Sequence, residues 1–251
     1  VLVGNNSLFS RATHAVMKEA IKKTGGKVIG EVLVPLESAK LDKLQNILER
    51  KKPDIVLNTL RGKGNETLFT MLAKRAEAGT RVPALSFGIN AITLASMNKE
   101  ALVGHFIASH YSHTLESEAN LEFMKRFRKK YGHERIITGA MAAAYTSIFL
   151  WAEAVKAANA VKPDLVRVAL NGLSVEGPDG AATFDAKTGH TRRHSRVSRI
   201  EPDGQLKLVH ASIEPLLPEP FPGPKSEKSW RSFTGRMFED WGNRWSPPSA
   251  P

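Results

Sequence analysis

The chain has 251 residues, enough for one large or two small domains, and 36 Lys plus Arg against 25 Asp plus Glu give it a formal net charge of +11. Its 41% hydrophobic and 24% charged content is close to the globular average and excludes a disordered chain. The absence of cysteine excludes disulfides, cysteine nucleophiles and thiolate metal sites, and no stretch approaches the 18 consecutive apolar residues of an ordinary transmembrane helix.

Strands and helices alternate along the first 109 residues. Apolar or β-branched runs predict strands, and apolar residues at helical spacing between these runs predict helices. Strands separated by helices of 10–15 residues indicate a parallel sheet with right-handed crossovers. Because Val1 already lies inside an apolar run, we expect further sequence before it. The predicted strands cover residues 1–3, 27–34, 54–60, 83–87 and 106–108.

The pattern changes near Tyr111. Helices are predicted at 119–131, 141–161 and 164–170 with no strand between them. The apolar faces of the first two are wider than the helices could bury on one another, so we expect a covering sheet that this sequence lacks. Apolar surface is therefore expected to stay partly uncovered at Phe123, Phe127, Ile148 and Phe149.

Short strands with turns are predicted from Gly177 onward, at 181–184, 195–200 and 206–210. Beyond Pro215 the chain is proline-spaced, then basic and rich in tryptophan. We expect residues 218–251 to form a tail that wraps around the domain or extends from it.

Several blocks occur in the order and spacing of one family. They include Leu2-Val3-Gly4-Asn5-Asn6 and Gly177-Pro178-Asp179-Gly180. Over residues 1–222 the chain resembles the urea and short-chain amide substrate-binding proteins. The other matching blocks are 25–31, 34–36, 52–60, 143–145, 185–191, 199–205 and 214–220.

The resemblance implies an α/β fold of the type I periplasmic-binding-protein (Venus-flytrap) kind, with two lobes, a hinge and a ligand in the cleft. Residues 1–110 and 174–217 would form the second lobe. Residues 111–173 would return to the first lobe, whose first half is missing.

The resemblance also implies a function without chemistry. The chain would belong to a periplasmic solute-binding protein of an ABC-type transporter for urea, a short-chain amide or an amino-acid-like solute, closing at the hinge and docking on a membrane permease. A cytoplasmic amide sensor, or a sensor domain that controls a regulatory partner, is the alternative.

Three loops that follow predicted strands carry candidate ligand contacts. A neutral amide needs donors, acceptors and an apolar wall, and ligands of parallel sheets bind outside the carboxyl ends of the strands. A serine or threonine at a strand end is, however, more often a turn or helix cap. The candidates are Asn6, Ser7 and Phe9, then Thr59, Leu60 and Arg61, then Ser86 and Phe87, with Tyr111 at the hinge crossing.

The rival motifs are weaker. His110 and His113 with Glu116 lack the register of a metal-binding helix, and Gly62-Lys63-Gly64 lacks the rest of a phosphate loop. No Ser/His/Asp set stands out, so we expect no enzyme, metal or cofactor. The basic stretches 125–135 and 187–199 leave a nucleic-acid-associated module as a second alternative, which we do not favour because a basic helix face usually meets only water.

Overall fold

A computed structural model describes residues 1–36 and 38–248. The chain forms two compact units. The first comprises Val1–Ile89, Met97–Ile107 and the segment from Phe221 onward, and the second comprises Asn90–Ser96 and Ala108–Pro220.

A parallel sheet forms the centre of the first unit. Its strands lie in the order β5-β4-β3-β1-β2, and all neighbours run in the same direction, as the alternating sequence pattern predicted. The chain therefore leaves β1 toward one side for β2 and then returns past β1 to place β3 on its other side. The strands are β1 (Leu2–Asn5), β2 (Glu31–Val34), β3 (Val56–Thr59), β4 (Ala84–Ser86) and β5 (Phe106–Ser109).

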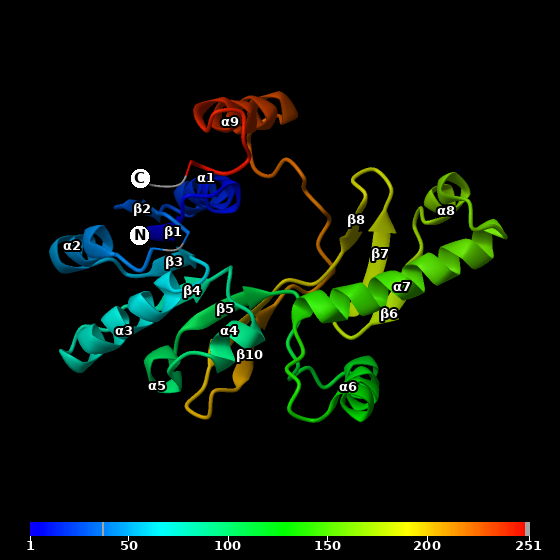
Figure 1. The fold of residues 1–251 in the computed structure, drawn as a ribbon, viewed down its shortest axis with the longest axis horizontal. Helices are drawn as coiled ribbons and strands as arrows, with labels where there is room; N and C mark the ends of the chain where they lie inside the picture. The colour runs from blue at the N-terminus through cyan, green and yellow to red at the C-terminus, as the bar shows by residue number, and fades with distance from the viewer. Residues whose placement is uncertain (37, 249–251) are drawn as a thin grey trace. The chain divides into compact units, whose positions relative to one another are not determined.

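Helices cover both faces of this sheet. Figure 1 shows α1 (Leu8–Lys23) on one face and α2 (Asp42–Lys51) with α3 (Gly64–Glu77) on the other, as right-handed crossovers require for this strand order. The short helix α5 (Lys99–Leu102) follows before β5. Leucines at helical spacing point into the core, and each such buried side chain stabilises the fold by about 1.5–3 kcal/mol. The fully buried ones include Leu44, Leu48, Leu68 and Leu72.

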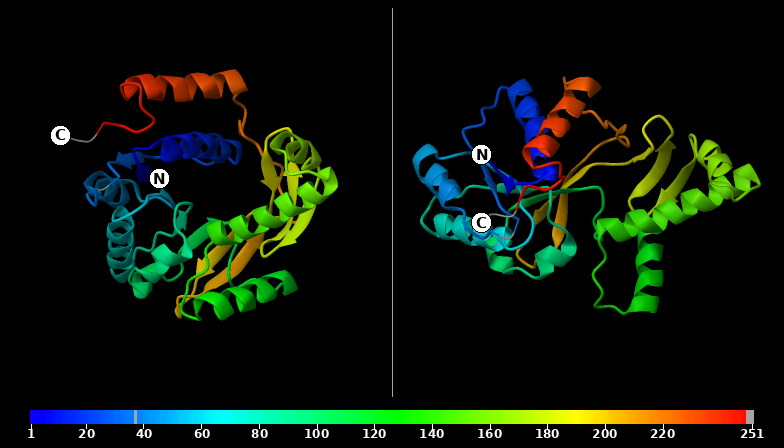
Figure 2. Two further views of the ribbon diagram at one scale, coloured as in Figure 1. Left: turned by 45° about the vertical axis from the view of Figure 1, so that its right-hand side comes forward. Right: turned by 45° about the horizontal axis from the view of Figure 1, so that its top comes forward.

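The tail contains a helix that the sequence pattern did not predict. Helix α9 (Glu227–Asp240) lies beside α1 in Figures 1 and 2, with Ser226 as its N-cap. Its buried residues are Trp230 and Met237, and Trp241 is buried at its C-terminal end, with 6–7% of each residue exposed. The density of proline and aromatic residues had hidden this helical spacing.

The second unit contains the three successive helices that were predicted. They are α6 (Glu118–Tyr131), α7 (Gly139–Ala158) and α8 (Pro163–Ala169), and the short α4 (Ala91–Ala95) also belongs here. Helix α7 contacts α8 and strand β6. An antiparallel sheet of β6 (Ser174–Gly177), β7 (Gly180–Asp185) and β8 (His190–Arg192) is followed by the hairpin β9 (Arg196–Ile200) and β10 (Leu206–Ala211). Of these, β6 and β8 were not predicted.

The expected uncovered apolar surface is confirmed on α7. Ile148 is 64% exposed and Phe149 42% exposed. The expectation was wrong for Phe123, which is 4% exposed. It packs with Tyr111 and Ile137, which lie outside the helices, and with residues of α6 and α7. No helix in the described part of the chain has both the length and the apolar character needed to cross a membrane.

A buried histidine in the first unit makes stability depend on pH. His105 is 5% exposed, its Nδ1 accepts a hydrogen bond from the Ala84 N–H at 2.9 Å, and its ring meets Phe69 edge-on. Burial and then the Arg81 charge lower the pKa of His105 to about 4, from 6.5. The unfolded chain therefore binds a proton at a higher pH than the folded one, so stability is full above pH 6.5 and falls as the pH drops toward 4.

We expect protonation of His105 in the unfolded chain to lower the free energy of unfolding by on the order of 3 kcal/mol as the pH falls from 6.5 to about 4. The slope should be up to about 1.4 kcal/mol per pH unit. Urea unfolding at pH 7.5, 6 and 5 measures it. His105→Asn keeps an acceptor near the Ala84 N–H but does not titrate, so its stability should fall less on acidification than that of the wild type. Parallel pH profiles for the two proteins would contradict this assignment.

Candidate functional site

The strand order creates a switch point between β1 and β3. Because the connections that leave these two strands lie on opposite faces of the sheet, their loops separate at the carboxyl edge, which is where ligands of open parallel sheets bind. Two of the three predicted loops, at Asn6–Phe9 and at Thr59–Arg61, lie at this point. The third follows the neighbouring strand β4.

Close backbone packing brings the third loop to the second. The Phe87 N–H donates to the Asn58 carbonyl at 2.9 Å. A Cβ on Gly88 would lie 3.0 Å from the Leu60 carbonyl oxygen, so glycine permits this approach. The structure therefore gathers the predicted loop residues of the first unit along one edge.

Asparagines that the sequence analysis passed over hold the loops in place. Asn5 Oδ1 accepts a hydrogen bond from the Arg61 N–H at 2.6 Å. Asn58, fully buried, donates to Asn65 Oδ1 at 2.9 Å and to Ser86 Oγ at 3.0 Å, and it accepts from the Leu60 N–H at 2.9 Å. An asparagine inside an otherwise apolar strand was the available indication of this network.

Four of the predicted contacts have structural roles. Ser7 Oγ caps α1 by accepting from the Ser10 N–H at 3.2 Å. Thr59, Leu60 and Ser86 are fully buried, and the Thr59 hydroxyl donates to the Val3 carbonyl at 3.2 Å while Ser86 receives the Asn58 amide. The three buried residues support the loops from inside the first unit. Ser7 is a helix cap, which is the more common role of a serine at a strand end.

Four other predicted contacts of the first unit are partly or fully exposed: Asn6, Phe9, Arg61 and Phe87. The Arg61 guanidinium lies over the Phe9 ring, 4.6 Å from its centroid, which fixes a cation against an aromatic face. Asn6 Oδ1 accepts a hydrogen bond from Arg11 Nε at 2.8 Å. The edge therefore offers a positive charge, amide groups and aromatic surface.

Tyr111 belongs to the other unit. It is 4% exposed, and its hydroxyl donates to Asn120 Oδ1 at 2.9 Å. Burial, and then the Asp179 charge, raise the pKa of Tyr111. Tyr111 is therefore a packed core residue of the second unit.

A histidine beneath the edge has partners like those of a catalytic triad. His14 Nε2 lies 2.9 Å from Thr59 Oγ1, and His14 Nδ1 lies 2.9 Å from Glu31 Oε1. His14 and Thr59 are fully buried, so no substrate can reach them, and the group instead joins α1 to strands β2 and β3. Burial lowers the pKa of His14, against the opposing effect of Glu31.

The two histidines of the rival metal motif have protein partners. His110 Nε2 lies 3.1 Å from the Gly139 carbonyl oxygen, and His113 Nε2 lies 3.1 Å from Gln205 Oε1. Across residues 1–36 and 38–248, no cluster of three or more His, Asp or Glu side chains is placed to hold a metal.

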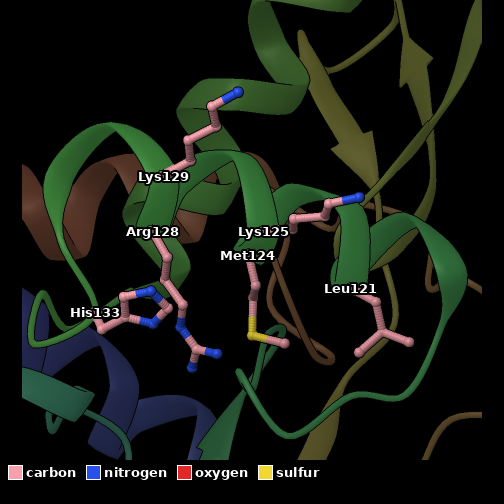
Figure 3. A pocket seen from close by; sticks show the side chains of 6 residues that line it. All are labelled: Leu121, Met124, Lys125, Arg128, Lys129 and His133. Atoms are coloured by element: carbon pink, nitrogen blue, oxygen red, sulfur yellow. The ribbon is translucent and has the colours of Figure 1, made fainter.

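A shallow hollow of about 470 Å³ lies on α6 in the second unit (Figure 3). The amino groups of Lys125 and Lys129 point away from the Arg128 guanidinium, and no carboxylate lines the hollow. The hollow is lined by Leu121, Met124, Lys125, Arg128, Lys129 and His133.

A family model described as "Periplasmic binding protein domain" matches residues 1–227. The chain belongs to this family, and the type I fold that the resemblance implied is confirmed. The family is broader than the urea and short-chain amide group, so that narrower assignment remains a hypothesis about the ligand.

Solved structures share the fold at low sequence identity. A solute-binding protein of an ABC transporter from Rhodopseudomonas palustris BisB5, in complex with 3,4-dihydroxybenzoic acid, has a TM-score of 0.72 and 21% identity, with 86% of this chain and 61% of that chain covered. A second solute-binding protein of an ABC transporter, from R. palustris HaA2 in complex with p-hydroxybenzoic acid, has a TM-score of 0.75 and 20% identity, with 86% of this chain and 60% of that chain covered. The Leucine-, isoleucine-, valine-, threonine-, and alanine-binding protein from Brucella ovis has a TM-score of 0.74 and 14% identity, with 86% of this chain and 58% of that chain covered.

This chain thus spans 58–61% of the length of these three structures. They are named as binding proteins and not as enzymes. A curated protein named limonene hydroxylase, from Geobacillus stearothermophilus, is 24% identical over 150 residues, which cover 57% of this chain and 27% of that protein.

Proposed function

We propose that this chain is part of a solute-binding protein of an ABC-type transport system and that the carboxyl edge of β1, β3 and β4 contacts the solute. The observation that carries the proposal is the switch point, where the Arg61 and Phe9 pair lies beside Asn6. Membership of the periplasmic binding protein family supports it. Its proposed contacts are the exposed or partly exposed residues of the three loops, Asn6, Phe9, Arg61 and Phe87.

The chemistry of this edge favours a small organic carboxylate with an apolar body. A guanidinium binds a carboxylate through charge-assisted hydrogen bonds, and an aromatic ring accommodates an apolar or aromatic body. The solved neighbours include complexes with benzoate derivatives, which have this chemistry. Urea and short-chain amides remain the alternative solutes, because amide groups at the edge can bind them without a charge.

Hinge closure is the proposed mechanism. Solute bound at the edge gains contacts in a closed state, and a membrane permease recognises that state. In this proposal residues 1–110 and 174–217 form one lobe, residues 111–173 belong to the other, Tyr111 lies at the crossing, and the protein works in the periplasm.

Titration of the chain with 4-hydroxybenzoate, leucine, acetamide and urea tests the proposal. We expect a carboxylate solute to raise the unfolding temperature by mass action on the folded state. Arg61→Ala should weaken carboxylate binding by about 10-fold or more, since hydrogen bonds to charged groups contribute about 1.5–3 kcal/mol. Arg50→Ala, at an exposed arginine of α2, is the matched control and should bind as the wild type does.

If acetamide or urea raises the unfolding temperature of the wild type and of Arg61→Ala by the same amount, the result would instead favour an amide as the solute. No response to any of these solutes at millimolar concentration would contradict the proposal. The basic hollow on α6 favours one competing function, the binding of a polyanion, and DNA retention that survives physiological salt would support it.

A further inference from the structure

Helix α9 begins where the family match ends. The match covers residues 1–227, and α9 runs from Glu227 to Asp240. This added segment is nevertheless built into the first unit. The Trp230 indole donates to the Pro222 carbonyl at 3.0 Å, and Met237 and Trp241 are 6% and 7% exposed.

The C-terminal end of α9 contacts Arg11, and Arg11 contacts the first loop of the solute edge. The Arg11 guanidinium lies 5.9 Å from the centroid of the Trp241 ring. The same guanidinium donates from Nε to Asn6 Oδ1 at 2.8 Å. Trp241, Arg11 and Asn6 thus form a continuous chain of contacts from the tail to the first loop of the proposed site.

The chemistry of arginine fixes which way the Asn6 amide faces. A guanidinium has only donors, so the asparagine atom that meets it must be the carbonyl oxygen. With Oδ1 on the Arg11 side, the Nδ2 donors are on the other side of the amide and can contact a ligand at this half-buried position. Asn6 held in this way presents hydrogen-bond donors to the ligand, which suits a carboxylate.

We propose that Trp241 is a positioning residue for the solute site: it holds Arg11, and Arg11 holds the Asn6 amide with its donors toward the ligand. The inference rests on the proposed function. It assigns Trp241, at the C-terminal end of α9, a role in selecting carboxylate solutes over amides of the same shape.

Trp241→Ala in the full chain tests the proposal, with 4-hydroxybenzoate and 4-hydroxybenzamide as paired probes. We expect a five- to tenfold loss of 4-hydroxybenzoate affinity, the scale of a partly desolvated cation–π contact, and less than twofold for the amide, which can bind either orientation of Asn6. Trp241→Phe keeps a ring face and should stay within about twofold of the wild type.

Two further variants separate positioning from folding. Trp245→Ala removes a tryptophan of the same tail that is 58% exposed and contacts the Phe238 ring at a tilt, so it should change neither affinity. Arg11→Met leaves α9 in place but cannot donate to Asn6, and it should reproduce the selective loss. In two-dimensional NMR spectra, the Asn6 side-chain amide signals should move in Trp241→Ala and Arg11→Met and not in Trp245→Ala.

Equal effects of Trp241→Ala and Trp245→Ala on both probes, or an equal loss for the acid and the amide, would overturn the inference. If the wild type binds neither probe, the proposed function fails. The Asn6 amide signals still decide the positioning contact in that case, because unchanged signals in Arg11→Met would refute it.

Discussion

Gly4→Ala is expected to destabilise the protein by at least about 3 kcal/mol, the upper end for overpacking a core. Gly4 lies in β1, opposite Thr59 of β3. A Cβ at this position would overlap Thr59 Oγ1 and would lie 2.8 Å from Ser10 Oγ and 2.9 Å from Ser10 Cβ. All three atoms belong to short, buried side chains that cannot rotate away, so either α1 or β3 must move.

Urea unfolding followed by circular dichroism measures this effect. Gly235→Ala is the matched control, because nothing lies within 4 Å of a Cβ there, and alanine in place of glycine inside α9 should stabilise by up to about 1 kcal/mol. A Gly4→Ala protein as stable as the wild type would show that α1 does not pack this closely on β1 and β3.

Asn58→Leu is expected to cost about 3–5 kcal/mol and to loosen the second and third loops of the solute edge, those after β3 and β4. The substitution leaves the Leu60 N–H, Asn65 Oδ1 and the Ser86 hydroxyl without their buried partner, and each such group costs about 1–3 kcal/mol. Because typical domains are stable by only about 5–15 kcal/mol, the variant should unfold at a much lower urea concentration.

Hydrogen exchange gives the second readout. The amides of residues 58–61 and 86–88 should lose protection in Asn58→Leu. Asn90→Leu, at an exposed asparagine that caps α4, should cost only about 1 kcal/mol and leave these amides unchanged. Similar costs for the two substitutions would mean that Asn58 does not organise the edge.

The sequence predicted the sheet better than the site. Alternating apolar runs and helical spacing were enough to predict parallel strands, because both are local patterns. The order of the strands depends on long-range packing, so the switch point between β1 and β3 could not be predicted. The same limit explains Thr59 and Ser86: their place at a strand end was predicted correctly, but only the packing of α1 and the position of Asn58 show that their side chains are buried.

The tail was the largest omission in the predicted elements. Trp230, Met237 and Trp241 recur at helical spacing after a serine cap, yet the surrounding prolines and aromatics favoured an irregular tail. In the second unit, Phe123 was wrongly expected to be exposed. It packs against Tyr111, Ile137 and Ala142, which lie outside the predicted helix 119–131, so the helical pattern of that segment alone does not reveal its burial.

A solute titration followed by amide NMR tests the central claim most directly. With 4-hydroxybenzoate added to the isotopically labelled chain, we predict that the largest chemical-shift changes fall on residues 6–9, 60–61 and 87–88, at the carboxyl edge of β1, β3 and β4. Changes concentrated elsewhere, for example on α6, or no changes with any solute of the panel, would contradict it.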